Sequence, residues 1–313
     1  MSGKGNEGPA ISIRGLTKYY GGQKVVDQLH LEIPRGCIFG FLGRNGAGKT
    51  TTIRMLMGIV EPTRGAAEVL GHDCTRWTPE LRERVGYLAE GHHVYGWMSV
   101  AECGRFQAGF HRRWNRDIFH AVIGHFNLKE KQRAGGLSRG QRAGLCLALT
   151  LAPEPELLVL DDPALGLDPV ARRSLLEAML YVTRQDDRTI LFSSHLLSDM
   201  ERVADRIAVM DRGVLRAYCT IDDFRARVRQ FILRFKERPP APPELPGLVH
   251  SFRTDREMAL TIVNASDDDR AVMGGLRPEE IEEVDLGLEE AFVSYVGERG
   301  EKSFFLHDLG AKK

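Results

Sequence analysis

The sequence of 313 residues lacks several features that would place it in particular classes of protein. It has no apolar run that approaches the ~18 residues with which a helix crosses a bilayer, so no membrane-spanning segment is predicted. The first ten residues are polar and rich in glycine, and we expect them to form a flexible N-terminus rather than a signal peptide. No internal repeat is visible.

The sequence also lacks a net charge and a cysteine framework. Its 43 basic and 43 acidic residues cancel, so no overall charge favours nucleic acid or an anionic membrane surface as a partner. The five cysteines are scattered without paired spacing, which argues against disulfides and a zinc site and suits a reducing cytosol. We therefore expect a cytoplasmic protein that has no nucleic-acid partner.

What the sequence does have is a glycine-rich loop between a short apolar run, residues 37–42, and the start of a helix at residues 50–57. The run suits a strand buried in a parallel sheet. Glycines let the backbone turn tightly and approach a ligand closely, and the free N–H groups of the helix make an anion site. The loop reads Gly43-Arg44-Asn45-Gly46-Ala47-Gly48-Lys49-Thr50.

This order of strand, loop and helix predicts a site for a nucleoside triphosphate. Lys49 is expected to reach the β- and γ-phosphates, and the hydroxyl of Thr50 is expected to hold Mg²⁺. The alternative is a glycine-rich turn before a helix with an ordinary exposed lysine.

Two acids follow a second apolar strand, residues 157–160. Asp161 ends this strand, where an aspartate is rarely placed unless it binds something, so we expect it to ligate Mg²⁺ through water. The alternative is an aspartate that starts a turn before Pro163.

A helix is predicted from Ser138 to Ala152, ending before two prolines. Ser138 and Gln141 have the spacing of a capping box. A capped N-terminus that contains Gly140 also presents N–H groups to a phosphate, so a structural and a ligand-binding interpretation are compatible.

Ser138 follows Lys49 by 89 positions, and Asp161 follows Ser138 by 23. With the P-loop, the Leu137-Ser138-Arg139-Gly140-Gln141 segment and the acids in this order, the chain resembles the nucleotide-binding subunit of an ABC transporter. The resemblance covers about residues 11–220. It implies an α/β P-loop NTPase fold of the ABC-ATPase type, with a mixed sheet core, an antiparallel β subdomain and an α-helical signature subdomain.

The resemblance gives catalytic roles to residues that depart from the family pattern. Asp162 takes the position of the usual glutamate that polarises the attacking water, and its side chain ends about 1.5 Å short. A misplacement of ~1 Å can cost on the order of a hundredfold in rate. Glu90 replaces a glutamine that contacts Mg²⁺. Because neighbouring carboxylates repel one another's charge, we hypothesise that Glu90 shares the base role with Asp162; the alternative is an exposed loop acid.

Further residues receive roles from the resemblance alone. His195 corresponds to the switch histidine that contacts the γ-phosphate, although a histidine after a strand is more often a structural cap. Tyr20 corresponds to the aromatic residue that stacks on adenine, with Tyr19 as a rival. Asp168 belongs to a loop that crosses the dimer interface, and its alternative is an N-cap before Pro169. The nucleotide contacts implied within the P-loop and the signature segment are Gly43, Asn45, Gly46, Gly48, Lys49, Thr50, Thr51, Ser138, Gly140 and Gln141.

Strands alternating with helices indicate a parallel sheet covered on both faces. We predict an ATPase domain over residues 11–220, with a helical subdomain at about 91–150, and a small α+β accessory domain over residues 221–313. Within these domains the expected elements are antiparallel strands at 11–33 with a turn at Gly21-Gly22, strands at 85–88, 157–160, 189–193 and 206–210, mainly helix at 97–135, a helix at 170–183, strands at 231–235 and 260–263, a stiff linker at 238–247, and a helix with Leu288, Ala291, Phe292, Tyr295 and Val296 on one face.

The resemblance implies an ATPase subunit that uses ATP and Mg²⁺. Two ATP molecules would close a dimer, which is a homodimer or else a heterodimer. The helical region would move a separate integral membrane permease, and the permease would hold the chain at the inner face of the membrane. Within the family it looks most like ATPases paired with ABC-2-type export permeases. The alternatives are an ATP-dependent switch that hydrolyses slowly or not at all, suggested by Asp162, and a soluble ABC ATPase outside transport.

Overall fold

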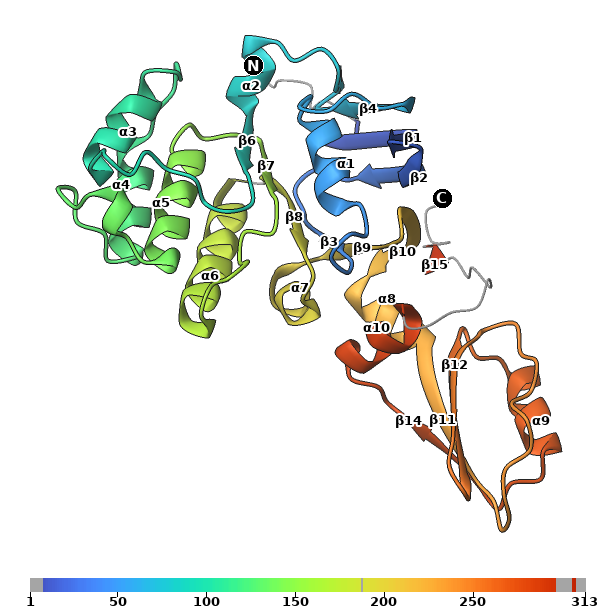
Figure 1. The fold of residues 1–313 in the computed structure, drawn as a ribbon. Helices are drawn as coiled ribbons and strands as arrows, with labels where there is room; N and C mark the ends of the chain where they lie inside the picture. Colours follow the sequence, from blue (N-terminus) through green and yellow to red (C-terminus); the bar gives the residue numbers. More distant parts are fainter. Residues whose placement is uncertain (1–7, 187, 297–305, 308–313) are drawn as a thin grey trace. The chain divides into compact units, whose positions relative to one another are not determined.

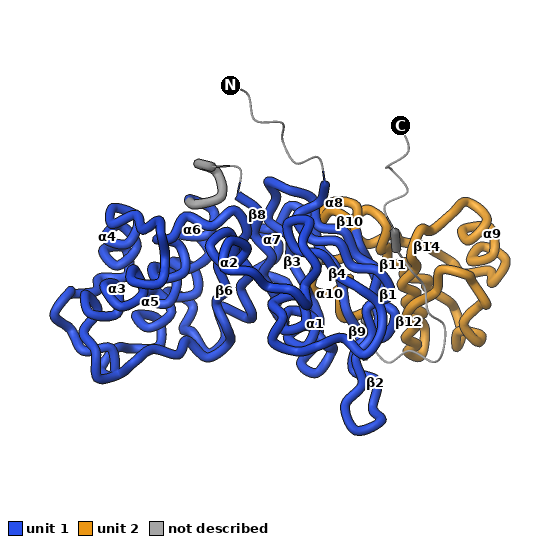
Figure 2. The backbone as a smooth tube through the Cα atoms, turned by 90° about the horizontal axis from the view of Figure 1, so that it is seen from above, with its two compact units in different colours: residues 1–218 blue, residues 219–313 orange. Residues whose placement is uncertain are grey.

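The computed structural model describes residues 8–186, 188–296 and 306–307, and the chain divides into two compact units, residues 1–218 and 219–313 (Figures 1 and 2). Most of the N-terminus expected to be flexible, residues 1–7, lies outside the described part. No helix among the described residues has the length and apolarity to span a membrane.

The first unit is built on a sheet whose strands lie in the order β10, β9, β3, β8, β7, β6. The pairs joining β9, β3, β8, β7 and β6 are parallel, which confirms the expected parallel sheet. Strands β3, β7 and β8 are buried along their whole length, as near-continuous apolar runs require. The bounds are β3 Ile38–Leu42, β6 Val85–Leu88, β7 Leu157–Leu160, β8 Thr189–Ser194, β9 Arg206–Asp211 and β10 Val214–Thr220.

A second, antiparallel sheet of the first unit has the order β2, β1, β4, β5. Strands β1 and β2 are joined at Gly21 and Gly22, which have φ angles of 52° and 86°. Positive φ at both central residues gives the turn whose twist matches a hairpin, so the predicted turn is confirmed. The bounds are β1 Ile11–Tyr20, β2 Gln23–Ile33, β4 Arg64–Val69 and β5 His72–Asp73.

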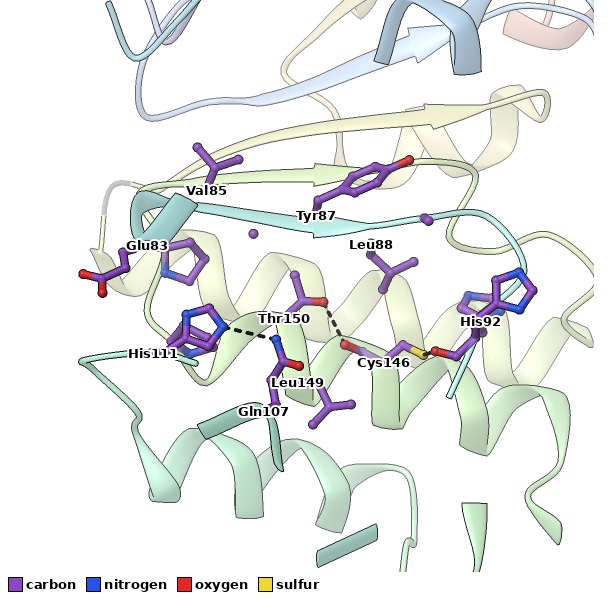
Figure 3. A pocket seen from close by; sticks show the side chains of 15 residues that line it. Glu83, Val85, Tyr87, Leu88, His92, Gln107, His111, Cys146, Leu149 and Thr150 are labelled. Atoms are coloured by element: carbon purple, nitrogen blue, oxygen red, sulfur yellow. Dashed lines mark hydrogen bonds between the residues drawn. The ribbon is translucent and has the colours of Figure 1, made fainter. Parts of the chain in front are cut away.

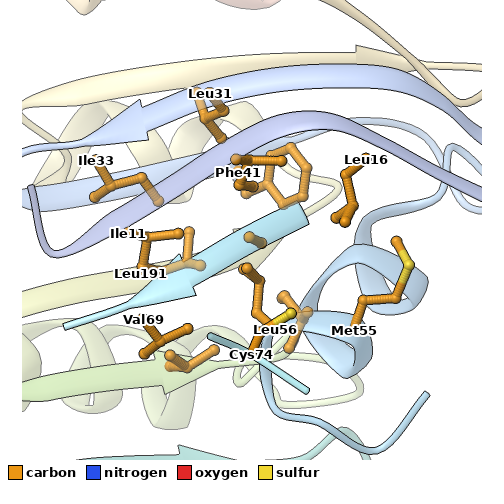
Figure 4. Close-up of a cluster of buried hydrophobic side chains, with 14 of the residues drawn as sticks. Ile11, Leu16, Leu31, Ile33, Phe41, Met55, Leu56, Val69, Cys74 and Leu191 are labelled. Atoms are coloured by element: carbon orange, nitrogen blue, oxygen red, sulfur yellow. The ribbon is translucent and has the colours of Figure 1, made fainter. Parts of the chain in front are cut away.

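A continuous apolar core joins the two sheets of the first unit to helix α1 (Lys49–Leu56) (Figure 4). Phe41 of β3 and Ile11 of β1 are both at most 1% exposed in this core. On the other face of β3, a Cβ on Gly40 would lie 2.2 Å from the sulfur of Met200 in α7 (Leu197–Val203), so α7 packs directly on the strand. Each large apolar side chain buried here contributes about 1.5–3 kcal/mol, and the core fixes the elements on both sides of the P-loop.

The remaining helices of the first unit include a bundle of α3, α4 and α5, in which α5 contacts both others. Residues 97–135, which we expected to be mainly helical, contain the two short helices α3 and α4 and the 3₁₀ helix η1. Between α3 and α4, residues 109–115 are not helical, because Gly109 ends one helix and the Asn115 side chain caps the next. The bounds are α2 Pro79–Arg84, α3 Val100–Ala108, α4 Arg116–His125, the 3₁₀ helix η1 Ala134–Gly136, α5 Arg139–Leu151 and α6 Pro169–Asp186.

The second unit has its own antiparallel sheet, in the order β12, β13, β11, β14, and its own apolar core. Phe231 and Leu233 alternate into this core from β11, which confirms the predicted half-buried strand. The helix predicted near the C-terminus buries Ala291, Phe292 and Tyr295; the side chains of Leu288 and Val296 lie outside the described part. The bounds are α8 Ile221–Arg227, β11 Val228–Arg234, β12 Leu248–Arg253, β13 Glu257–Val263, α9 Asp267–Gly275, β14 Glu280–Val284, α10 Leu288–Val296 and β15 Leu306–His307.

Candidate nucleotide-binding site

The P-loop runs from the end of β3 to the start of α1 so close to the surrounding backbone that two of its positions require glycine. A Cβ on Gly43 would lie 2.4 Å from the carbonyl oxygen of Met210, and one on Gly48 would lie 2.7 Å from that of Val25. Gly48, the N-cap of α1, also has φ of 104°, a value that residues with a Cβ rarely adopt. The glycine spacing is therefore a requirement of local sterics.

Lys49 is the first residue of α1 and is almost entirely buried. Its Nζ donates hydrogen bonds to the carbonyl oxygens of Gly43 at 2.6 Å and Arg44 at 3.2 Å, so the ammonium lies inside the curve of the loop. Burial lowers the pKa of Lys49, and the negative charges of Asp162, Asp161 and Glu90 oppose that effect. The lysine is thus held at the helix N-terminus, where a phosphate would be favoured.

A cavity of about 300 Å³ opens over the P-loop. Besides loop residues from Asn45 to Thr51, it is lined by Glu90, from the segment after β6, and by Asp162, from the segment after β7. The structure thus brings three sequence-predicted parts of the site to one cavity. A triphosphate chain bound on the loop amides would meet both acids.

Asp161 presents one satisfied and one unsatisfied carboxylate oxygen. Its Oδ1 accepts hydrogen bonds from Thr50 Oγ1 at 3.0 Å and Ser193 Oγ at 2.9 Å, whereas the buried Oδ2 has no hydrogen-bond partner. Burial raises the pKa of Asp161, against the two hydroxyl donors. An orphaned buried carboxylate oxygen beside a threonine hydroxyl is the donor chemistry that Mg²⁺ prefers. The residues present therefore fit this cation, with Glu90 as a further oxygen donor.

Asp162 and His195 contact each other directly. Asp162 Oδ2 accepts a hydrogen bond from His195 Nδ1 at 2.9 Å, and the Asp162 N–H donates to Ser193 Oγ at 2.8 Å. Asp162 has φ of 43°, in the left-handed region that aspartate and asparagine tolerate better than most residues. The shorter acid therefore lines the cavity and also contacts the histidine.

Three further polar residues near the site were not predicted. Ser193 joins the two acids. His92 is buried, and its Nε2 lies 2.8 Å from the carbonyl oxygen of Pro163, joining the segment after β6 to the segment after β7. Asp199 of α7 accepts a hydrogen bond from Ser194 Oγ at 3.1 Å. None of the three carries a local sequence signal for its contact. Ser193 is one of two adjacent serines at the end of β8, and nothing in the strand alone distinguishes it from Ser194.

Ser138 caps α5, and its capping box with Gln141 is confirmed by two hydrogen bonds of 3.2 Å. Ser138 and Gln141 are absent from the residues that line the P-loop cavity. A Cβ on Gly140 would lie 2.6 Å from that of Ala171, so this glycine also lets α5 approach α6 closely. The N-terminus of α5 is thus well formed and lies outside its own chain's P-loop cavity.

Asp168 caps α6, as the structural alternative proposed. Its Oδ1 accepts hydrogen bonds from the backbone N–H groups of Val170 and Ala171, each at 3.0 Å. The side chain of Tyr20 is 47% exposed, and the Lys18 ammonium lies 5.1 Å from the centroid of the Tyr20 ring. Asp168 and Tyr20 do not appear among the described residues that line the P-loop cavity, and their roles toward nucleotide stay predictions.

A second cavity of about 300 Å³ lies between β6 and the helices α3 and α5 (Figure 3). Its lining combines the strand that leads to Glu90 with the helix that Ser138 caps. Four exposed aromatic residues lie next to each other on α3 and on the segments that flank it, and the ring centroids of neighbours are 5.1–6.0 Å apart: Tyr95, Trp97, Phe106 and Phe110. We call these four residues the aromatic patch.

Comparisons with known proteins agree with this geometry. The family model for ABC transporters matches residues 26–165. The chain is 35% identical to the bacitracin transport ATP-binding protein BcrA of Bacillus licheniformis, over 71% of this chain and 73% of that protein. The chain belongs to the ATP-binding proteins of ABC transporters. The daunorubicin/doxorubicin resistance ATP-binding protein DrrA of Streptomyces peucetius is 34% identical, over 72% and 70% of the two chains.

Solved structures show the same fold. An ATP-binding subunit of an ABC transporter is 28% identical with a TM-score of 0.62, and the match covers 69% of this chain and 92% of that one. A dimeric bacterial ABC transporter cassette, at 18% identity, has a TM-score of 0.60 over 67% and 98% of the chains. The predicted ABC ATPase fold is confirmed. As a member of this family the chain is an ATP-binding subunit with ATPase activity that energises transport.

Proposed function

We propose that this ABC ATPase energises an export permease. The similarity to proteins named for bacitracin transport and drug resistance supports this, as does 36% identity, over 66% of this chain and 65% of that one, to a Nod factor export ATP-binding protein from Ralstonia nicotianae. The single observation on which the activity depends is the cavity that joins the P-loop, Glu90 and Asp162. The chain is then a peripheral protein at the cytoplasmic face of the membrane, held there by the permease.

The working unit in this proposal is a dimer that encloses two ATP molecules. Each triphosphate lies on the P-loop of one protomer and meets the capped N-terminus of α5, with Ser138 and Gly140, from the other. This arrangement is supported by the position of Ser138 outside its own P-loop cavity and by the dimeric cassette of the same fold. The free N–H groups and the dipole of a 13-residue helix favour a phosphate at that end.

Hydrolysis follows from the placement of the acids. Lys49 and the loop N–H groups hold the β- and γ-phosphates, and Asp162 accepts the proton of the water that attacks the γ-phosphorus while the bond to ADP breaks. His195, hydrogen-bonded to Asp162, orients that carboxylate. Mg²⁺, held by Thr50, Asp161 and Glu90, supplies positive charge for the phosphate oxygens when bound.

The permease contact in this proposal is the aromatic patch together with the cavity of Figure 3. Trp97 and Phe110 are each 67% exposed, and aromatic residues are enriched where proteins bind one another. The cavity borders both β6, which leads to Glu90, and α5, which Ser138 begins. A permease segment seated there would therefore sense changes in both halves of the nucleotide site.

Recovery of the chain in washed membranes tests this proposal. With a co-expressed ABC-2-type permease we expect the wild-type chain in the membrane fraction, and without the permease we expect it in the soluble fraction. The double change Trp97→Ala and Phe110→Ala should release it from the membranes. Tyr181→Ala, which removes an aromatic side chain that is 66% exposed on α6, is the matched control. Equal retention of the double variant and the control would refute the assigned surface.

A further inference from the structure

Ser193, near the end of β8, connects the two acids that follow β7. Its side chain is fully buried, at 0% exposure. Its Oγ donates a hydrogen bond to Asp161 Oδ1 at 2.9 Å and accepts one from the Asp162 N–H at 2.8 Å. One hydroxyl group therefore holds the side chain of the first acid and the backbone of the second.

The contact with Asp161 determines how that carboxylate is presented. Oδ1 receives two hydroxyl donors, from Ser193 and Thr50, and this leaves Oδ2 as the oxygen without a partner. Two donors on one oxygen limit rotation of the carboxylate.

The contact with Asp162 supports an unusual backbone conformation. Asp162 has φ of 43°, and a buried N–H left without a partner would destabilise this conformation. Ser193 supplies that partner. Because the backbone turn at this position directs the Asp162 carboxylate to His195, the same hydroxyl fixes the place of the acid that we assign to proton transfer.

We propose that Ser193 is a positioning residue for ATP hydrolysis, acting through Asp161 and Asp162 without contacting the nucleotide. This inference rests on the proposed roles of the two acids. The positioning role belongs to a buried hydroxyl rather than to a charged group. A side chain of the same volume without a hydroxyl is therefore expected not to replace Ser193.

Three variants separate the hydroxyl from the space it fills. Ser193→Cys keeps nearly the same volume but has a weak donor and acceptor, whereas Ser193→Thr keeps the hydroxyl. Thr189→Val is the matched control, because Thr189 is a buried residue at the other end of β8 whose hydroxyl accepts a hydrogen bond from Gly36 N–H at 2.9 Å. Thermal unfolding midpoints of all three show how far each change affects the fold.

We expect Ser193→Cys to lower kcat by about 10- to 100-fold, the loss that corresponds to one hydrogen bond to a charged group. KM for ATP should rise by no more than the affinity that Mg²⁺ adds, and Ser193→Thr and Thr189→Val should stay near the wild-type kcat. A Cys variant that turns over like the control, or a Thr variant no better than the Cys variant, would overturn the inference.

A binding measurement keeps the inference separate from the proposed function. Fluorescent trinitrophenyl-ATP is titrated in Mg²⁺ and in EDTA. The Cys variant should match the wild type in EDTA and lose most of the affinity that Mg²⁺ adds, while the control keeps it. An unchanged Mg²⁺ effect would overturn the role at Asp161. A wild-type chain without turnover would instead refute the proposed function, and the Mg²⁺ effect would still decide the role of Ser193.

Discussion

Asp162→Asn removes the charge of the proposed base while keeping its shape. Asparagine tolerates the φ of 43° as well as aspartate does, and its amide oxygen can still accept from His195 Nδ1, which now lies 2.9 Å from Oδ2. A general base contributes about 10²–10⁴-fold to a rate, so we expect kcat to fall by that factor. Binding of ATP should be unchanged or tighter, because one negative charge leaves a cavity that Glu90 also lines.

Phosphate release at saturating ATP measures kcat, and calorimetry measures ATP binding. Asp269→Asn is the control, because it makes the same change at a buried acid that completes the capping box of Ser266 at the start of α9, in the second unit, and does not line the cavity. A kcat for Asp162→Asn close to that of the control would show that another group accepts the proton. Weaker ATP binding without loss of kcat would contradict the reasoning as a whole.

Three other changes have defined outcomes. Burial lowers the pKa of Lys49, so the charged form of this lysine destabilises the folded state. The destabilisation is absent above pH 10.5, the ordinary pKa, and grows as pH falls through the lowered pKa. Lys49→Met should therefore raise the free energy of unfolding at pH 7, by an amount that shrinks toward pH 10.5, and a gain in urea titrations that does not depend on pH would be contrary evidence. Gly48 has φ of 104°, and a Cβ there would lie 2.7 Å from a backbone oxygen, whereas a Cβ on Gly46 would meet nothing within 4 Å. Gly48→Ala should therefore lower the free energy of unfolding by more than the ~1–2 kcal/mol of backbone strain expected for Gly46→Ala. Equal unfolding midpoints of the two variants would disprove the steric argument. Glu90→Gln with Asp162 intact should slow phosphate release if the two acids share the base role, and unchanged turnover would end that hypothesis.

Local signals were sufficient for some parts of the site. Glycine spacing predicted the P-loop, serine and glutamine at capping distance predicted the start of α5, and an acid at the end of an apolar run marked Asp161. Ser193 was missed because its partners are set by the pairing of β7 with β8, in which Leu160 lies opposite Phe192. Such a register is long-range information that neither strand contains alone.

The second unit shows a different limit. Strand β14 (Glu280–Val284) is acidic and mostly exposed at the edge of its sheet, so it lacks the apolar alternation by which β11 was recognised. Its pairing partners include Arg234, which forms ion pairs with Glu280 and Glu282. Edge strands with charged side chains avoid pairing with other chains, and the same charges remove the pattern on which a sequence-based prediction depends.

Mixing two inactive variants tests most directly whether ATP is enclosed between protomers. Lys49→Ala removes the phosphate-binding lysine, and Ser138→Asp keeps a good N-cap for α5 while placing a negative charge where the triphosphate would lie. If each site combines Lys49 of one protomer with Ser138 of the other, a mixed dimer has one intact site. The account predicts that an equal mixture recovers about a quarter of wild-type turnover, because half of the random dimers are mixed and each has one of two sites. A mixture as inactive as its components would contradict it.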